Sequence, residues 1–158
     1  MPENDDVPDV RRARVITAST RAAAGIWEDR SGPTIVTGLA ALGLAVDGPV
    51  VVADGKPVED ALRAAIAEGF DLVVTTGGTG LTPSDLTPEV TLLVIDRLVP
   101  GIAEAIRNHG VSQGIPTAVL SRGIAGLAGR TLIINLPGSP GGARDGLTVL
   151  APLLDHAL

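Results

Sequence analysis

The chain has 158 residues, a length typical of one domain. A net charge of −6, with no clustered basic segment, excludes the electrostatic pattern of a nucleic-acid-binding or polybasic membrane-binding protein. Because the chain has no cysteine, disulfide bonds, zinc–thiolate centres and a cysteine nucleophile are excluded as well.

The amino-terminal segment lacks the character of a folded element. Residues 1–10 read MPENDDVPDV, which is acidic and proline-containing and does not resemble a secretory leader. We expect residues 1–12 to form a disordered tail and residues 13–158 to form a single domain. No apolar run approaches the roughly 18 residues that a membrane span needs, so a cytoplasmic protein is expected.

Short apolar and β-branched runs alternate with helix-like segments along the rest of the chain. The runs predict five strands, at residues 13–19, 50–54, 70–76, 117–121 and 131–136. Helices are predicted to begin near Ser31, Pro57, Thr87, Ile102 and Pro140. This alternation predicts an α/β fold in which helices cover both faces of a parallel sheet.

Ligands of open parallel sheets bind beyond the carboxyl ends of the strands, so the residues that follow each predicted strand are candidates for a site. In chain order these segments are Ser19-Thr20-Arg21, Asp54-Gly55, the turn 77–80, Ser121-Arg122-Gly123 and the stretch 135–142. If the strands are mutually parallel, all five segments share one rim of the sheet.

The turn Gly77-Gly78-Thr79-Gly80 is the most unusual of these segments. Glycine is costly to order, but its backbone approaches a ligand closely, and successive N–H groups can form an anion-binding concavity. A mobile strand-to-helix turn is the alternative, and the neighbouring Thr76 favours the anion loop. A P-loop is excluded because no Lys-Ser/Thr follows, and the dinucleotide-binding glycine spacing is absent.

Two acids follow predicted strands. Asp85 lies two residues before Thr87, the expected helix start, where an acid can simply favour the helix dipole. Asp54 precedes a glycine, which is common in an ordinary turn. Together the two carboxylates are suited to hold a magnesium ion against phosphate oxygens. Arg122 is suited either to anion binding or to a surface ion pair.

Three segments resemble signatures of the MoaB/Mog family of molybdenum-cofactor biosynthesis proteins. They are TTGGTGLTPSDLTPEVT at 75–91, SRGIAGLAGRTLIINLPGSPGGARDGL at 121–147 and WEDRSGP at 27–33. The resemblance covers roughly residues 13–157 and is strongest to actinobacterial Mog-type members.

This resemblance implies a three-layer α/β/α domain with a mostly parallel central sheet, the molybdopterin-binding domain fold, assembled as a homotrimer. It implies a molybdopterin adenylyltransferase that transfers AMP from Mg-ATP to the molybdopterin phosphate and passes its product to a molybdate-insertion protein. A MoaB-like, pterin-binding trimer or scaffold without turnover is the alternative. A generic nucleotide-binding α/β domain is a third interpretation.

The resemblance also assigns roles to residues. Asp85 matches the signature acid and Asp54 the second acid, and both would act in catalysis and bind the metal. The pterin and phosphate contacts would come from Gly77, Gly78, Thr79, Gly80, Ser121, Arg122, Asn135, Pro137, Gly138 and Ser139. The chain departs from the family at Ser84, where arginine is common, and at Thr20, where aspartate is common, so one phosphate contact and one polar pocket contact are not carried over.

Overall fold

The computed structural model describes residues 9–158 of the chain. The tail expected at residues 1–12 therefore falls largely outside the described residues, and Arg12 already begins the first strand. Within the described residues, no helix has the length and apolar character needed to cross a membrane.

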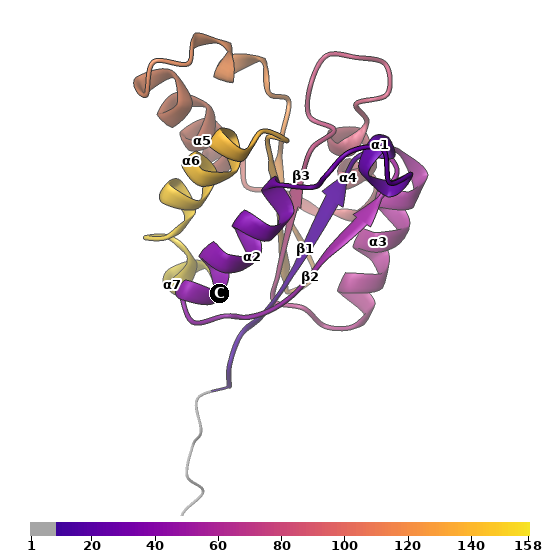
Figure 1. The fold of residues 1–158 in the computed structure, drawn as a ribbon. Coiled ribbons are helices and arrows are strands. Elements are labelled where there is room, and N and C mark those ends of the chain that lie inside the picture. The colour runs from indigo at the N-terminus through magenta and orange to yellow at the C-terminus, as the bar shows by residue number, and fades with distance from the viewer. Residues whose placement is uncertain (1–8) are drawn as a thin grey trace, which may run out of the picture.

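A six-stranded sheet forms the centre of the molecule (Figure 1). Its strand order is β2-β1-β3-β6-β5-β4, with bounds of Arg12–Ala18 for β1, Ala45–Val52 for β2, Leu72–Thr76 for β3, Arg97–Leu98 for β4, Ala125–Ala128 for β5 and Thr131–Leu136 for β6. The first four strands in that order run parallel, β5 runs antiparallel to β6, and β4 runs antiparallel to β5. The predicted α/β class with a mostly parallel sheet is confirmed.

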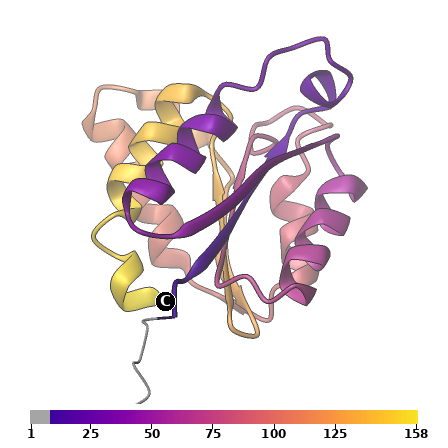
Figure 2. The same ribbon diagram turned by 60° about the horizontal axis from the view of Figure 1, so that its bottom comes forward.

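Helices cover the two faces of the sheet and complete three layers (Figure 2). On one face lie α2 (Ser31–Ala41), α5 (Pro100–Ser112), α6 (Pro140–Leu150) and α7 (Leu154–Ala157). On the other face lie α3 (Lys56–Ala67) and α4 (Thr87–Val94). A short helix, α1 (Thr20–Ala23), follows β1, and a 3₁₀ helix, η1 (Pro116–Leu120), follows α5.

Each face of the sheet has its own hydrophobic core, because neighbouring residues on a strand point to opposite sides. Val15 and Val74 pack with α2 and α6, whereas their neighbours Ile16 and Val73 pack with α3 and α4. All four side chains are fully buried. The apolar, non-alternating strand sequences follow from this burial on both faces.

The predicted strand at 117–121 is wrong, since this segment forms η1. Its apolar residues Val119 and Leu120 are 58% and 48% exposed, so they have no place in a buried strand. The sheet instead contains β5, whose sequence Ala-Gly-Leu-Ala has weak strand propensity but pairs with β6. The missed strand β4 has only two residues.

Two helix predictions also need correction. An additional short helix, α1, precedes the first predicted one, which begins near Ser31. The helix predicted to begin near Pro140 ends at Leu150, and α7 follows after residues 151–153, where Pro152 lacks the N–H that a continuous helix requires. Neither correction changes the order of the strands.

The strand order has a topological switch point at β1 and β3. The chain leaves β1 through α2, on one face, to reach β2, and it returns through α3, on the other face, to reach β3. The connections from the adjacent strands β1 and β3 therefore diverge at their carboxyl ends, which is where ligands bind in open α/β sheets. Thr20 and Gly77 follow these two strand ends.

Candidate functional site

The glycine turn at 77–80 begins directly at this switch point. Gly77 and Gly78 have φ angles of +89° and +68°, in the left-handed region that favours glycine. A Cβ atom on Gly77 would overlap the carbonyl oxygen of Ala18, and one on Gly78 would overlap the hydroxyl of Thr87. The turn thus needs glycine both for its backbone conformation and for its close fit against β1 and α4.

Asp54 lies beside this turn, at the end of β2. Its Oδ2 accepts hydrogen bonds from the Thr20 hydroxyl at 2.9 Å and from the Thr20 amide at 3.2 Å. The Thr20 hydroxyl oxygen in turn accepts from the Asp54 amide at 3.1 Å. The Oδ1 atom of Asp54 lies 3.0 Å from the position that a Cβ on Gly78 would occupy. Thr20 therefore fixes one carboxylate oxygen while the other faces the glycine turn.

Asp85 also lies beside this turn, and it follows the turn in the chain, whereas Asp54 precedes it. Its Oδ2 accepts hydrogen bonds from the Thr82 amide at 3.0 Å and from the Thr82 hydroxyl at 2.7 Å. The same oxygen lies 2.8 Å from the position that a Cβ on Gly80 would occupy. The structure thus brings both predicted acids, which are 31 positions apart in the sequence, to one four-residue turn.

The geometry fits a divalent cation held jointly by protein and substrate. Within the described part of the chain, no group of three or more histidine and acidic side chains could hold a metal ion. Magnesium is usually bound by one or two carboxylates together with substrate phosphates, so a third protein ligand is not required. Asp54 and Asp85, both only partly exposed beside the glycine amides, meet this requirement.

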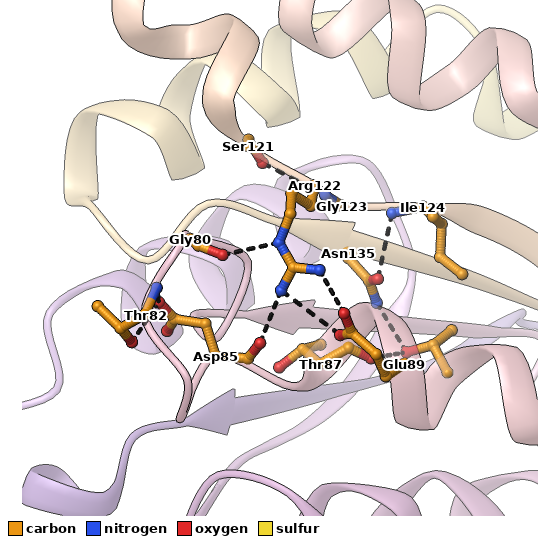
Figure 3. Close-up of polar contacts among 11 residues, drawn as sticks. Gly80, Thr82, Asp85, Thr87, Glu89, Ser121, Arg122, Gly123, Ile124 and Asn135 are labelled. Atoms are coloured by element: carbon orange, nitrogen blue, oxygen red, sulfur yellow. Dashed lines mark hydrogen bonds and ion pairs between the residues drawn. The ribbon is translucent and has the colours of Figure 1, made fainter.

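Ser121 and Arg122 also reach the glycine turn, although the segment before them is not a strand. The Arg122 amide donates to the Thr79 carbonyl at 2.9 Å, and the Ser121 hydroxyl contacts that of Thr79 at 3.3 Å. The Arg122 guanidinium contacts the loop after the turn and Glu89 in α4 (Figure 3). Hydrogen bonding to Arg122 lowers the pKa of Glu89, and that to Glu89 raises the pKa of Arg122.

Pro137, Gly138 and Ser139 form the neighbouring wall of the rim. The buried Thr76 hydroxyl donates to the Pro137 carbonyl at 2.7 Å. A Cβ on Gly138 would lie 3.1 Å from the Cα of Gly77, so the two turns are in close contact. Ser139 caps α6, where its hydroxyl accepts from the Gly142 amide at 3.0 Å. The two predicted turns therefore lie together, as their strand order requires.

Asn135 is placed differently from the other candidates. Its side chain is 3% exposed and lies within the fold, below the rim. Its oxygen accepts from the Ile124 amide (Figure 3). Its amide nitrogen donates to the hydroxyls of Thr75 and Thr91. These contacts join β3, β6 and α4, so the side chain supports the site from beneath.

A cavity of about 170 Å³ opens between α5, η1 and the turn at 137–139. Predicted site residues in its lining are Ser121, Pro137 and Ser139. Asp145 of α6 adds a carboxylate, and Ile106 and Ile115 add apolar surface. A larger cavity of about 580 Å³ involves Arg11, Leu44 and Leu154 and contains none of the predicted site residues.

Several residues at this rim have roles that the sequence did not assign to them. Thr20 and Thr82 hold the two acids, Glu89 pairs with Arg122, and Asp145 lines the smaller cavity. Thr20 was noted as a departure from the family, and its hydroxyl here serves as the partner of Asp54. The single lysine, Lys56, pairs with Asp60 at 2.7 Å, and this contact raises the pKa of its amino group.

Comparisons with known proteins agree with the signatures in the sequence. A family model described as "Probable molybdopterin binding domain" matches residues 14–156. The chain is 43% identical to a "Molybdenum cofactor biosynthesis bifunctional protein" of Synechococcus elongatus over 92% of its own length and 46% of that relative's. It thus spans about half the length of this curated relative.

Two further proteins match this chain over most of its length and over most of their own. A "Molybdopterin adenylyltransferase" of Helicobacter pylori is 38% identical, over 91% of this chain and 84% of that protein. The solved structure of the molybdopterin biosynthesis Mog protein from Mycobacterium ulcerans is 52% identical with a TM-score of 0.89, over 94% of this chain and 97% of that chain.

Proposed function

Because the chain belongs to the MoaB/Mog family of molybdopterin-binding domains, we propose that it is a molybdopterin adenylyltransferase of molybdenum-cofactor biosynthesis. In this reaction the phosphate of molybdopterin attacks the α-phosphorus of ATP, and pyrophosphate leaves. The observation that carries the proposal is the convergence of Asp54 and Asp85 on the glycine turn at the switch point of the sheet.

The chemistry requires little proton transfer, because a phosphate monoester is already ionised near neutral pH. The main obstacle is the mutual repulsion of two polyanions. Rate acceleration should then come from positioning and from charge stabilisation in a preorganised site. The backbone amides of Gly78, Thr79 and Gly80 would bind and orient the attacking phosphate, since the left-handed glycines allow close approach. The Gly77 amide donates to the Leu136 carbonyl at 3.2 Å and fixes the start of the turn.

Asp54 and Asp85 would hold magnesium, which when bound neutralises phosphate charge and stabilises the leaving pyrophosphate. Thr20 and Thr82 keep one oxygen of each carboxylate occupied by hydrogen bonds. Such outer contacts orient the carboxylates and leave their other oxygens available. The protein's task in this proposal is to keep both acids beside the glycine amides before the substrates arrive.

The smaller cavity would accept the pterin ring. It lies next to the glycine turn, because the Ser121 hydroxyl contacts Thr79 and the turn at Gly138 contacts Gly77. Apolar walls and the Asp145 carboxylate suit a flat heterocycle whose edge carries hydrogen-bond donors. A molybdopterin with its phosphate on the glycine turn would thus point its ring towards α5 and α6.

The test is an adenylyl-transfer assay with the full chain, ATP, molybdopterin and magnesium. We expect adenylylated molybdopterin and pyrophosphate in equal amounts, with loss of product when magnesium is chelated. Molybdopterin binding without transfer would support the binding-only alternative, and ATP binding without pterin affinity would support a generic nucleotide-binding domain. The homotrimer, the cytoplasmic location and the molybdate-insertion partner stay predictions.

A further inference from the structure

The Arg122 guanidinium joins both ends of the loop that carries Asp85. Its Nε donates to the carbonyl of Gly80 at 2.8 Å, and its Nη2 donates to the carbonyl of Asp85 at 2.7 Å. Its Nη1 donates to the carboxylate of Glu89, in the first turn of α4 (Figure 3). One rigid, planar group therefore contacts this part of the chain at three points.

The loop has few other attachments. Asp85 accepts from Thr82, which belongs to the same loop, so this contact sets the loop's internal shape and not its place on the rim. Every side-chain hydrogen bond that reaches residues 80–86 from elsewhere in the described chain comes from Arg122. The base of the loop is closed by the Thr87 amide, which donates to the Gly78 carbonyl at 3.0 Å.

The arrangement of Arg122 differs from that of an arginine waiting for a phosphate. All three of its side-chain nitrogens donate to protein oxygens, and two of the three acceptors are backbone carbonyls. The Arg122 amide is itself fixed to the Thr79 carbonyl. The side chain thus starts from one fixed point on the glycine turn and spans the acid-bearing loop that follows it.

We propose that Arg122 is a positioning residue, which holds the Asp85 carboxylate beside the glycine turn by bracing the carbonyls of Gly80 and Asp85. This role rests on the proposed adenylyl transfer, in which Asp85 acts on the substrates and Arg122 acts through Asp85. Loss of the brace should let the loop move and lower the rate of transfer, while the glycine amides continue to bind the phosphate.

Arg122→Lys separates this role from direct phosphate binding. Lysine keeps the positive charge, but its single nitrogen cannot reproduce the fork that spans two carbonyls and Glu89. We expect kcat to fall about tenfold, as for other residues that orient a catalytic group, with KM for ATP and for molybdopterin changed less than about threefold. A raised KM with unchanged kcat would overturn the proposal.

Hydrogen exchange of the substrate-free protein provides a second readout that does not depend on catalysis. The Thr87 amide closes the base of the loop by donating to the Gly78 carbonyl, so freeing the loop should increase the exchange of this amide at least about threefold in Arg122→Lys. Unchanged exchange would contradict the brace. If exchange is faster in Arg122→Lys but the natural chain has no transferase activity, the bracing role of Arg122 is supported and the proposed function is rejected.

Two further variants guard against a general loss of folding. Arg63→Lys is the matched control, because Arg63 also pairs with a helical glutamate, Glu59, at 2.9 Å, away from the acid-bearing loop. It should leave kcat and the exchange of the Thr87 amide unchanged. Glu89→Gln removes the charge from one of the three contacts and should produce a smaller change in the same direction as Arg122→Lys. An effect of Arg63→Lys equal to that of Arg122→Lys would reject the proposal.

Discussion

Asp54 is held by a neighbouring segment of the chain, whereas Asp85 is held by its own loop. The partner of Asp54 is Thr20, which follows β1, and the two residues exchange hydrogen bonds in both directions. Their strands are paired up to Ala18 and Val52, and the Ser19 amide donates to the Val52 carbonyl at 2.9 Å. The position of Asp54 is therefore set by the sheet itself.

Asp85 has no such link to the sheet through its carboxylate. Its partner Thr82 moves with it, and the loop is braced from outside by Arg122. Two acids of the same charge, beside the same turn, should therefore respond differently to substitution of their surroundings. Changes around Asp54 should act through the contact between two strand ends, and changes around Asp85 should act through the freedom of one loop.

Removing the charge of either acid should have the largest effect on the rate of adenylyl transfer. The rate should fall to a similar extent whether the charge is removed from Asp54 or from Asp85. In Asp54→Asn and Asp85→Asn the amide oxygen can still accept from threonine, so the fold is retained. We expect transfer to fall about a hundredfold or more in each variant, since each removes a charge that acts on the transferred phosphoryl group. The assay is initial-rate transfer at several magnesium concentrations.

The matched control for these variants is Asp47→Asn. Asp47 forms an ion pair with Arg14 at 2.6 Å, and among the described residues its carboxylate forms no hydrogen bond to the glycine turn. Transfer should be unchanged in this variant. Full turnover in Asp54→Asn or Asp85→Asn would remove that acid from the catalytic site.

Substitution of the two threonines should reveal the difference directly. Thr20→Val removes two hydrogen bonds between strand ends, the one to Oδ2 of Asp54 and the one from its amide. We expect transfer to fall about tenfold, which is typical when a partner that orients a ligand is lost. The backbone amide continues to donate to the acid in both variants, and Thr82→Val removes only one hydroxyl bond to Asp85, so we expect a decrease of only about threefold.

Thermal melting and transfer rates of both variants test this difference. Thr148→Val is a suitable control, because the Thr148 hydroxyl donates to a carbonyl of its own helix, α6. An effect of Thr82→Val as large as that of Thr20→Val would show that both acids depend equally on their threonines. The comparison between a sheet-held and a loop-held acid would then fail.

Local sequence patterns were sufficient to predict the parallel half of the sheet and the rim. The strands β1, β3 and β6 are apolar and β-branched because they are buried on both faces, and glycine at 77 and 78 is required by positive φ angles. The pattern failed at 117–121, where an apolar run faces solvent, and at β5, where pairing with β6 overrides weak propensity.

The contacts that hold the two acids in place could not be predicted in the same way. Thr20 and Asp54 are 34 positions apart, and Arg122 lies 37 positions from the carbonyl of Asp85 that it contacts. Contacts from a side chain to a distant backbone carbonyl leave no periodic signal in a sequence. Asn135 shows the converse, because its motif suggested a place in the pocket and its buried contacts place it beneath the rim.

The smallest expected effect is a dependence of stability on pH. It concerns the pair of Arg122 and Glu89, which braces the loop that carries Asp85. Because the hydrogen bond from Arg122 lowers the pKa of Glu89 from its ordinary value of 4.5, the pair stabilises the folded state fully above that value. This contribution is lost as the pH falls through the lowered pKa of the folded state. Among the described residues Asp54 forms no ion pair with an arginine.

Melting curves of the natural chain and of Glu89→Gln, measured from neutral to strongly acidic pH, test this expectation. At neutral pH the variant should melt about 2 °C lower or less, since the two side chains are 36% and 48% exposed and solvent screens the pair. The difference should shrink as the pH falls from 4.5 through the lowered pKa of Glu89, because protonation then removes the charge of Glu89 in the natural chain. A difference that stays constant or grows in acid would show that Glu89 acts through packing, and the brace on the Asp85 loop would then rest on the two carbonyl contacts alone.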